Sequence, residues 1–288
     1  MRNNKIDENI FLESLKNLIR PEDKVIVLFS GIWSFVNNLN FKNKNIPKTI
    51  LKILEKFVST NRTLILPSFS DQFVIKHNYF KINSSIDNIG VIPREALKSK
   101  KYYRTPQPLH SYLVLGKDVN KVKRLKFKTS WGKTSIFDYI CNSNARICNL
   151  GLNWNQGCSY LHRHEELTNV PWRYFKKFQF KMYRNKNFLG VCEEVKFCSP
   201  DNGLLKYDYK KFIPLIEKQK SFLKFDTNLF KFESIKAKCL DDVSKVFFKN
   251  RPFDIVINKK EVKNWIKNKK KIEMKKSVEA GQTLVGQL

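Results

Sequence analysis

Apolar runs and amphipathic stretches alternate along the first part of the chain. Residues 10–19 carry apolar side chains at the spacing of a helix that ends before Pro21, and the mainly apolar run at 24–29 has the length of a strand buried on both faces. A helical pattern at 47–58 then precedes another short apolar run at 63–66. This order of strand, helix and strand favours a parallel pair joined by a crossover helix.

The same alternation continues through the middle of the chain. Ser159 is a residue type that caps helix N-termini, so we expect it to cap the helix that follows it. The pattern predicts an irregular polar segment at 71–88, strands at 111–115 and 146–150, and helices at 90–98, 135–142 and 159–169.

The pattern changes in the last third of the chain. Residues 178–196 alternate apolar and polar side chains as paired antiparallel strands do, a helix is predicted at 208–218, and strand-like alternation returns at 221–238. We therefore expect an α/β fold, with a three-layer α/β/α core, a mostly parallel sheet and an antiparallel β-containing C-terminal part. The predicted organisation is a single domain with insertions over residues 1–258, followed by a Lys-rich tail over 259–288.

The charge of the chain is strongly positive. Its 288 residues include 55 Lys and Arg against 26 Asp and Glu, a formal net charge of +29 that indicates an anionic partner. Nucleic acid, a membrane surface and a phosphorylated ligand such as CoA or a nucleotide sugar all fit that sign. Heavy use of Lys, Asn, Ile and Phe is also typical of a codon bias, which accounts for part of the excess.

We expect a cytoplasmic protein without disulfides or a metal site. No apolar run approaches the roughly 18 to 20 residues of a membrane-spanning helix, and residues 1–13 include acids where a signal peptide has a basic flank and an apolar centre. Six cysteines are scattered without a C-x-x-C pair, which is typical of buried thiols in a cytoplasmic chain.

His110 is the first candidate for chemistry. It follows Pro106 and Pro108, which restrict the approach of the chain, and it stands just before a predicted strand. An imidazole with a pKa near neutrality suits general-base catalysis. A single loop histidine is nevertheless more often a surface residue.

A second cluster lies at the start of the helix predicted at 159–169. His162, Glu165 and Glu166 are three and four positions apart, so they share one helix face. The order H-x-H-E-E is not the zinc motif H-E-x-x-H, and a solvated first turn with favourable acids is the alternative interpretation. The chain contains no Walker loop, G-x-G-x-x-G or G-x-S-x-G, so P-loop, Rossmann and serine-hydrolase chemistry have no sequence support.

Several short motifs, taken in order, resemble one enzyme family. They are G-V-I-P-R-E at 90–95, P-L-H-S at 108–111, G-K-D at 116–118, S-W-G-K at 130–133 and L-H-R-H-E-E-L-T-N-V-P-W-R at 161–173. Their order and spacing are similar to those of the aminoglycoside 3-N-acetyltransferase family, which is distinct from the common GNAT acetyltransferases. The resemblance extends from about residue 10 to residue 256.

The resemblance implies that an acetyl group passes from acetyl-CoA to an amine on a sugar-like ring, in a ternary complex and without a metal. It implies that His110 is the catalytic base and that Glu165 or Glu166 orients its imidazole or grips the acceptor. His162 and Asp71 are candidates for acceptor binding. The residues implied to line the CoA site are Ser30, Gly31, Ser85, Arg104 and Ser111.

The chain also departs from the family pattern. Gln107 stands where the family usually has a histidine or a charged residue, and the family's Ser-rich first loop is F-S-G-I-W-S at 29–34. Gly31, Ser85 and Arg104 also have purely structural interpretations, as a turn, a cap and a surface charge. Acceptor contacts and CoA packing are therefore open at this point.

Charge predicts the kind of acceptor. Aminoglycosides are polycations, and a chain of charge +29 slows their encounter. We therefore expect an amino sugar with its own negative charge, such as a nucleotide-linked sugar of surface-polysaccharide biosynthesis. An antibiotic-modifying resistance enzyme is the alternative.

A nucleic-acid-binding protein is the alternative from another class. The net charge, the segment Tyr102-Tyr103-Arg104 and the Lys-rich stretch at 259–276 with Trp265 support it. No RNA or DNA motif accompanies them, so the enzyme is preferred. The sequence leaves open whether the chain forms a homo-oligomer.

Overall fold

A seven-stranded sheet organises the protein, in the order β4-β5-β2-β1-β6-β10-β9. The computed structural model describes residues 5–268 except 88, 158, 201–202 and 228. β1 pairs in parallel with β2 and β6, whereas β5 and β10 run opposite to the other strands. The strands are β1 (Val25–Ser30), β2 (Thr63–Pro67), β4 (Tyr103–Arg104), β5 (Tyr112–Gly116), β6 (Arg146–Leu150), β9 (Leu223–Asp226) and β10 (Lys231–Lys236).

Strand β1 shows why the central runs are continuously apolar. Val25, Val27 and Phe29 enter one hydrophobic cluster, whereas Ile26 and Leu28 enter another. Because helices cover both faces of the sheet, both alternating sets of side chains are buried. The predicted α/β class and three-layer core are confirmed.

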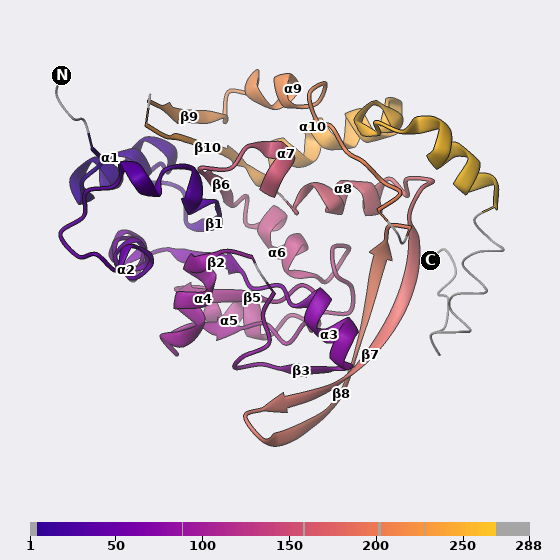
Figure 1. Ribbon diagram of the computed structural model, residues 1–288, viewed down its shortest axis with the longest axis horizontal. Coiled ribbons are helices and arrows are strands. Elements are labelled where there is room, and N and C mark those ends of the chain that lie inside the picture. Colours follow the sequence, from indigo (N-terminus) through magenta and orange to yellow (C-terminus); the bar gives the residue numbers. More distant parts are fainter. Residues whose placement is uncertain (1–4, 88, 158, 201–202, 228, 269–288) are drawn as a thin grey trace.

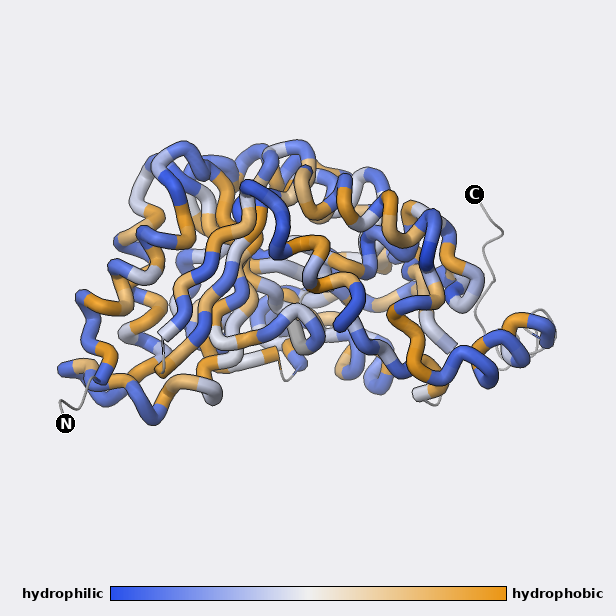
Figure 2. Tube along the Cα trace, turned by 90° about the horizontal axis from the view of Figure 1, so that it is seen from above, coloured by the Kyte–Doolittle hydropathy of each residue, from blue (hydrophilic) through white to orange (hydrophobic). Residues whose placement is uncertain are grey.

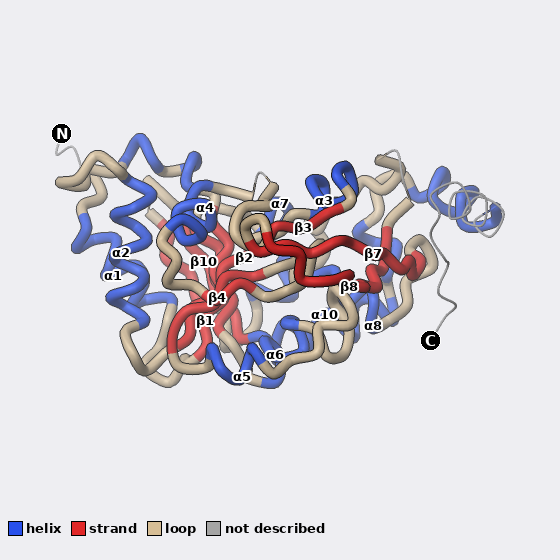
Figure 3. Tube along the Cα trace, turned by 90° about the horizontal axis from the view of Figure 1, so that it is seen from below, coloured by secondary structure: helices blue, strands red, loops and turns tan. Residues whose placement is uncertain are grey.

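Helices cover the two faces in separate groups (Figures 1 and 3). One face carries α1 (Glu8–Leu18), α2 (Ile46–Val58) and α4 (Val91–Lys98). Figure 2 shows apolar and polar positions alternating along the helices, as expected for elements buried on one side only. The other face carries α5 (Val119–Lys123), α6 (Ile136–Asn142), α8 (Leu161–Leu167), α9 (Ile213–Glu217) and α10 (Ala237–Asn250).

A second sheet of three strands extends from this core. β3 (Tyr79–Lys81) pairs in parallel with β7 (Tyr174–Arg184), which forms a long antiparallel hairpin with β8 (Asn187–Cys198). The base of the hairpin packs with α3 (Asp71–His77) in a third apolar cluster. Figure 1 shows the hairpin curving along the edge of the molecule, with its tip beside β3. The antiparallel pair predicted at 178–196 is confirmed.

The structure corrects three local predictions. The segment 71–88 holds α3 and β3, which are too short to show a clear periodicity in the sequence. Helix α8 begins at Leu161 with Tyr160 at its N-cap, so Ser159 does not cap it. The helix predicted at 208–218 is limited to α9, because Pro214 falls in its first turn.

Residues 259–268 form a further helix, which buries Val262 in the main core. The rest of the predicted Lys-rich tail, 269–288, lies outside the described residues. Within the part of the chain that the structure describes, no helix is long and apolar enough to span a bilayer. The remaining short elements are α7 (Trp154–Gly157), η1 (Ile32–Ser34), η2 (Val36–Asn38) and η3 (Pro252–Ile255).

Candidate active site

The loop that carries His110 is held between the two sheets. It leads into β5, and the Ser70 N–H donates to the carbonyl oxygen of Leu109 at 3.1 Å. On the other side, the Leu109 N–H donates to Glu194 Oε2 of β8 at 2.8 Å. These contacts fix the backbone on both sides of the imidazole, and the His110 side chain is only 6% exposed.

Glu194 is the acid that faces His110. Its Oε1 lies 3.8 Å from His110 Nδ1 and accepts a hydrogen bond from the Ser130 hydroxyl at 2.6 Å. Glu194 is completely buried and lies opposite Phe178 in the hairpin register. This residue was not predicted, and the signal that would have found it is an acid at an inward-facing position of a strand.

The second histidine, His162, is paired with Glu165 on the same face of α8. His162 Nδ1 lies 2.6 Å from Glu165 Oε2, which also accepts from Arg173 Nη2 at 2.9 Å. The other carboxylate oxygen accepts from the Tyr207 hydroxyl at 2.7 Å and the Trp172 indole at 3.2 Å. Glu165 is thus the fully buried centre of a network, and its partner imidazole retains 29% exposure.

The environment keeps both imidazoles neutral at neutral pH. Burial lowers the pKa of His162, and the neighbouring Arg173 lowers it further, against the opposing effect of Glu165. Burial likewise lowers the pKa of His110, and Lys196 adds to that effect. Each ring therefore has an unprotonated nitrogen, which is what a general base requires.

Trp131 brings the two histidines into one site. Its ring centroid lies 4.7 Å from that of His110 and 5.4 Å from that of His162. The same ring carries two cations on its π system, with Arg173 at 5.5 Å and Lys196 at 5.6 Å from the centroid. The motif S-W-G-K therefore supplies the aromatic wall that separates the imidazoles.

Asp71 and Lys196 form an ion pair beside His110. Lys196 Nζ lies 2.9 Å from Asp71 Oδ2, and their side chains are 15% and 31% exposed. Burial alone would raise the pKa of Asp71, but Lys196 and then His110 outweigh it, so the pKa lies well below its usual value. Asp71, which was predicted to bind the acceptor, is therefore ionised and already paired with Lys196.

Glu166 differs from the adjacent Glu165. It packs against Gly132, where a Cβ atom would lie 2.1 Å from Glu166 Oε1, so a larger residue there would displace the Glu166 carboxylate. Its Oε2 has no hydrogen-bond partner among the described residues. Burial raises the pKa of Glu166 to about 7, although Arg163 and Arg173 act in the opposite direction.

These contacts differ from the pairing that the resemblance implies, in which Glu165 or Glu166 orients His110, and the alternative role of gripping the acceptor stays a prediction. Glu165 orients His162, and the acid that faces His110 is Glu194 from the hairpin. Glu166 is directed at Gly132 instead. The sequence distance between His110 and Glu194 explains the difference, because only the docking of the hairpin onto the core brings them together.

Arg104 forms a buried network with two other residues predicted for CoA binding. Its Nε donates to the Ser111 hydroxyl at 3.0 Å, and its Nη2 donates to the carbonyl oxygens of Ser85 and Ser68, the latter at 2.6 Å. Nη1 donates to the carbonyl oxygen of Ile82 at 3.1 Å. Because these donors face protein oxygens, we assign Arg104 to holding three loops together rather than to a phosphate.

Ser30 and Gly31 lie elsewhere, at the carboxyl end of β1. The Gly31 N–H donates to the Leu150 carbonyl oxygen at 2.9 Å, and a Cβ atom on Gly31 would lie 2.4 Å from Leu152 Cδ2. The ends of β1 and β6 approach each other closely here, which explains why residue 31 is a glycine. A cavity of about 360 Å³ opens beside them, lined by Ser34, Gly151, Leu152, Asn153, Thr227, Leu229, Phe230 and Lys231.

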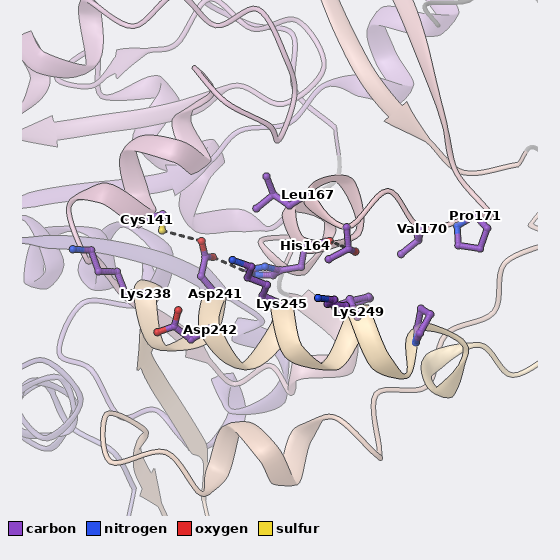
Figure 4. Close-up of a pocket in the computed structure, with 13 residues that line it drawn as sticks. Cys141, His164, Leu167, Val170, Pro171, Lys238, Asp241, Asp242, Lys245 and Lys249 are labelled. Carbon is purple, nitrogen blue, oxygen red and sulfur yellow. Dashed lines mark hydrogen bonds and ion pairs between the residues drawn. The ribbon is translucent and has the colours of Figure 1, made fainter. Parts of the chain in front are cut away.

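A larger cavity of about 720 Å³ lies between α8 and α10 (Figure 4). His164 lines it, together with Asp241, whose Oδ1 is 3.2 Å from His164 Nε2. The Cys141 thiol donates to Asp241 Oδ2 at 2.8 Å, and burial raises the pKa of that thiol to about 11. None of the predicted site residues lines this cavity, so the H-R-H segment of α8 divides its two histidines between separate environments.

Comparisons with known proteins agree with this architecture. A family model described as aminoglycoside 3-N-acetyltransferase matches residues 36–234. The chain is similar to AAC-IIIb in binary complex with CoASH, with 14% identity, a TM-score of 0.70 and coverage of 85% of this chain and 97% of that one. The chain is also similar to sisomicin-bound AAC-VIa, with 10% identity, a TM-score of 0.69 and coverage of 86% of this chain and 99% of that one.

YokD from Bacillus subtilis is also similar, with 13% identity, a TM-score of 0.65 and coverage of 85% of this chain and 94% of that one. At such identities the likeness to solved structures establishes the fold alone. The comparison with curated proteins gives no match.

Proposed function

This chain belongs to the aminoglycoside 3-N-acetyltransferase family, and on that premise we propose that it acetylates an anionic amino sugar with His162 as the general base. Family membership makes it an acyl-CoA-dependent N-acetyltransferase, with acetyl-CoA as the co-substrate. The observation that carries the proposal is the 2.6 Å contact between His162 Nδ1 and Glu165 Oε2.

That contact favours the tautomer with its proton on Nδ1, because Glu165 Oε2 at 2.6 Å lies closer to this nitrogen than Arg173 Nη2 at 3.1 Å. With Nδ1–H donated to Glu165, His162 Nε2 is left as the proton acceptor. The acceptor amine loses one proton to Nε2 as its nitrogen bonds to the thioester carbon. When the carbon–sulfur bond breaks, the proton passes from the imidazolium to the CoA sulfur. No covalent enzyme intermediate is needed, which agrees with a ternary complex.

His162 is preferred to His110 on two grounds. The His162 side chain is 29% exposed and the His110 side chain 6%, so a bound amine has better access to His162. The His162 imidazole is held by its acid at 2.6 Å, whereas His110 lies 3.8 Å from Glu194. We assign His110 to positioning Trp131 and the acceptor beside the base.

Lys196 supports an acceptor that carries negative charge. It lies beside His110 and over Trp131, and it neutralises Asp71, a carboxylate that would otherwise attract a cationic ring. The net charge of +29 acts in the same direction over a longer range. A phosphate-bearing amino sugar, such as a nucleotide-linked one, matches both features. The family name favours an aminoglycoside as the second candidate.

The test is the release of free thiol from acetyl-CoA, with a nucleotide-linked amino sugar and an aminoglycoside offered as separate acceptors. We expect turnover with the nucleotide-linked sugar, a loss of about 10² to 10⁴ in kcat for His162→Ala, and a loss below about tenfold for His110→Ala. A large loss of kcat confined to His110→Ala would instead identify His110 as the general base. Preference for the aminoglycoside, with micromolar KM, would reject the anionic acceptor.

A further inference from the structure

The tip of the β7–β8 hairpin exposes a cluster of large apolar side chains. Phe188, Leu189 and Val191 are 57%, 49% and 61% exposed, and they lie within four positions of one another. Single exposed apolar residues are ordinary on protein surfaces, whereas a contiguous group at one place marks an interaction site. Figure 1 shows this tip projecting from the molecule beside β3.

The hairpin register places Phe188 and Val191 on the same face of the hairpin as Lys181. Val191 lies directly opposite Lys181, and Phe188 lies opposite Tyr183, with ring centroids 5.5 Å apart. Residues that face each other across an antiparallel pair point to the same side of the sheet. The tip therefore combines the aromatic pair, Val191 and the basic Lys181 on one face.

All of the formal charges at the tip are positive. Lys181, Arg184 and Lys186 lie within the segment 174–192, which contains no Asp or Glu. The next acid along the chain, Glu193, is paired with Lys177 at 2.7 Å. The tip thus carries apolar side chains and three cations, and no acid, in one short stretch of chain.

The base of the hairpin is anchored, so the tip is presented at a fixed place. Phe178 and Phe180 are 4% and 3% exposed and pack with Val74 and Phe80. These side chains lie on the face of β7 that is directed at the core. The exposed apolar residues at the tip are therefore separate from this buried cluster.

We propose that the hairpin tip docks on the surface of an anionic phospholipid bilayer. Phe188, Leu189 and Val191 enter the boundary between headgroups and acyl chains, and the three cations at the tip contact lipid phosphates. A second copy of the chain fits less well, because two tips would bring like charges together and each chain carries +29. The inference is independent of the proposed acceptor and base.

The first test is co-sedimentation of the full chain with vesicles of phosphatidylcholine, and of phosphatidylcholine with phosphatidylglycerol at about 3:1. We expect binding to the anionic vesicles and little to the neutral ones. Phe188→Ser combined with Leu189→Ser should lower the bound fraction by about tenfold. Val246→Ser is the matched control, because Val246 is 62% exposed on α10. Equal binding by the tip variant and the wild type would reject the proposal.

The second test separates the tip from the overall charge. Reversal of the three tip cations, K181E with R184E and K186E, should abolish binding. The same charge change on exposed α2 positions, K48E with K52E and K56E, should reduce binding by less than about threefold. Equal loss in both sets would assign the binding to net charge and overturn the proposal. A dimer in sedimentation velocity that the serine variant abolishes would also overturn it. Acetylation of a soluble acceptor should stay within about twofold in every variant.

Discussion

Two adjacent glutamates on α8 have pKa values shifted in opposite directions because their neighbours differ. Burial alone raises the pKa of each. At Glu165, Arg173 and His162 outweigh burial and lower the pKa to about 2. At Glu166 the cations are less effective, and the pKa rises to about 7. The site therefore holds one permanent anion and one acid that titrates near neutrality.

Stability should depend on pH through Glu166. Its pKa is about 7 in the folded chain and near its usual 4.5 when unfolded, so the folded state binds the extra proton between these values. The free energy of unfolding of the wild type therefore falls as pH rises from about 4.5 to 7. Glu166→Gln removes the titrating carboxyl group. We expect its free energy of unfolding, measured by urea unfolding, to rise relative to that of the wild type by about 1–3 kcal/mol between pH 5 and pH 8. A constant difference between the two proteins across this range would contradict the prediction.

His162 should remain unprotonated, and acetylation should remain fast, at pH values below the usual pKa of histidine. Because burial and Arg173 lower the pKa of His162 below 6.5, kcat/KM should remain level down to about pH 6.5 and decline only at lower pH. Glu165→Gln removes a carboxylate that raises this pKa, so the midpoint should move to still lower pH while kcat falls by about 10² or more. A pH–rate profile of each protein measures both effects. A midpoint above 6.5 in the wild type would indicate another base.

At the level of elements, loops from separate strands are joined by buried polar groups. The Arg104 guanidinium links the ends of β2 and β4 to the segment around Ser85 and to Ser111. Burial lowers the pKa of this arginine to about 9, although Asp87 opposes the effect. The group is still cationic at neutral pH, so its contacts with carbonyl oxygens are charge-assisted.

Arg104→Met should therefore act on stability. The carbonyl oxygens of Ser68 and Ser85 would be left buried without their donor, and we expect a loss of about 3 kcal/mol in the free energy of unfolding. Arg124→Met, at an exposed position after α5, should change it by less than about 0.5 kcal/mol. If Arg104 bound a CoA phosphate instead, the variant would keep its stability and raise the KM for acetyl-CoA.

For the whole molecule, the excess of positive charge should govern encounter with substrates. A net charge of +29 attracts anions and repels polycations over distances comparable with the Debye length, about 10 Å at 0.1 M salt.

Salt should therefore change kcat/KM in opposite directions for the two classes of acceptor. Between about 50 and 300 mM salt we expect a fall of severalfold for a nucleotide-linked amino sugar and a rise for an aminoglycoside, because screening weakens attraction and repulsion alike. Steady-state rates at constant pH measure this, with an uncharged amino sugar as the control. A fall for both acceptors would point to an acidic pocket that dominates the global charge.

Local patterns were sufficient to predict most of the core. The runs at 24–29 and 63–66 are apolar because both faces are buried, and the alternation at 178–196 follows from a hairpin with one face against the core. Short elements such as α3 and β3 carry too few residues for a period to be visible.

What the sequence by itself determined is most of the longer elements, the family and the residue types available for chemistry. The pairing of His162 with Glu165 could be anticipated, because three positions on a helix bring side chains to one face. The pairing of His110 with Glu194 was decided only by the tertiary structure. Those residues come from a loop and a hairpin, and their contact depends on how two sheets dock, which is set by the combined packing of many side chains and leaves no local pattern in the chain.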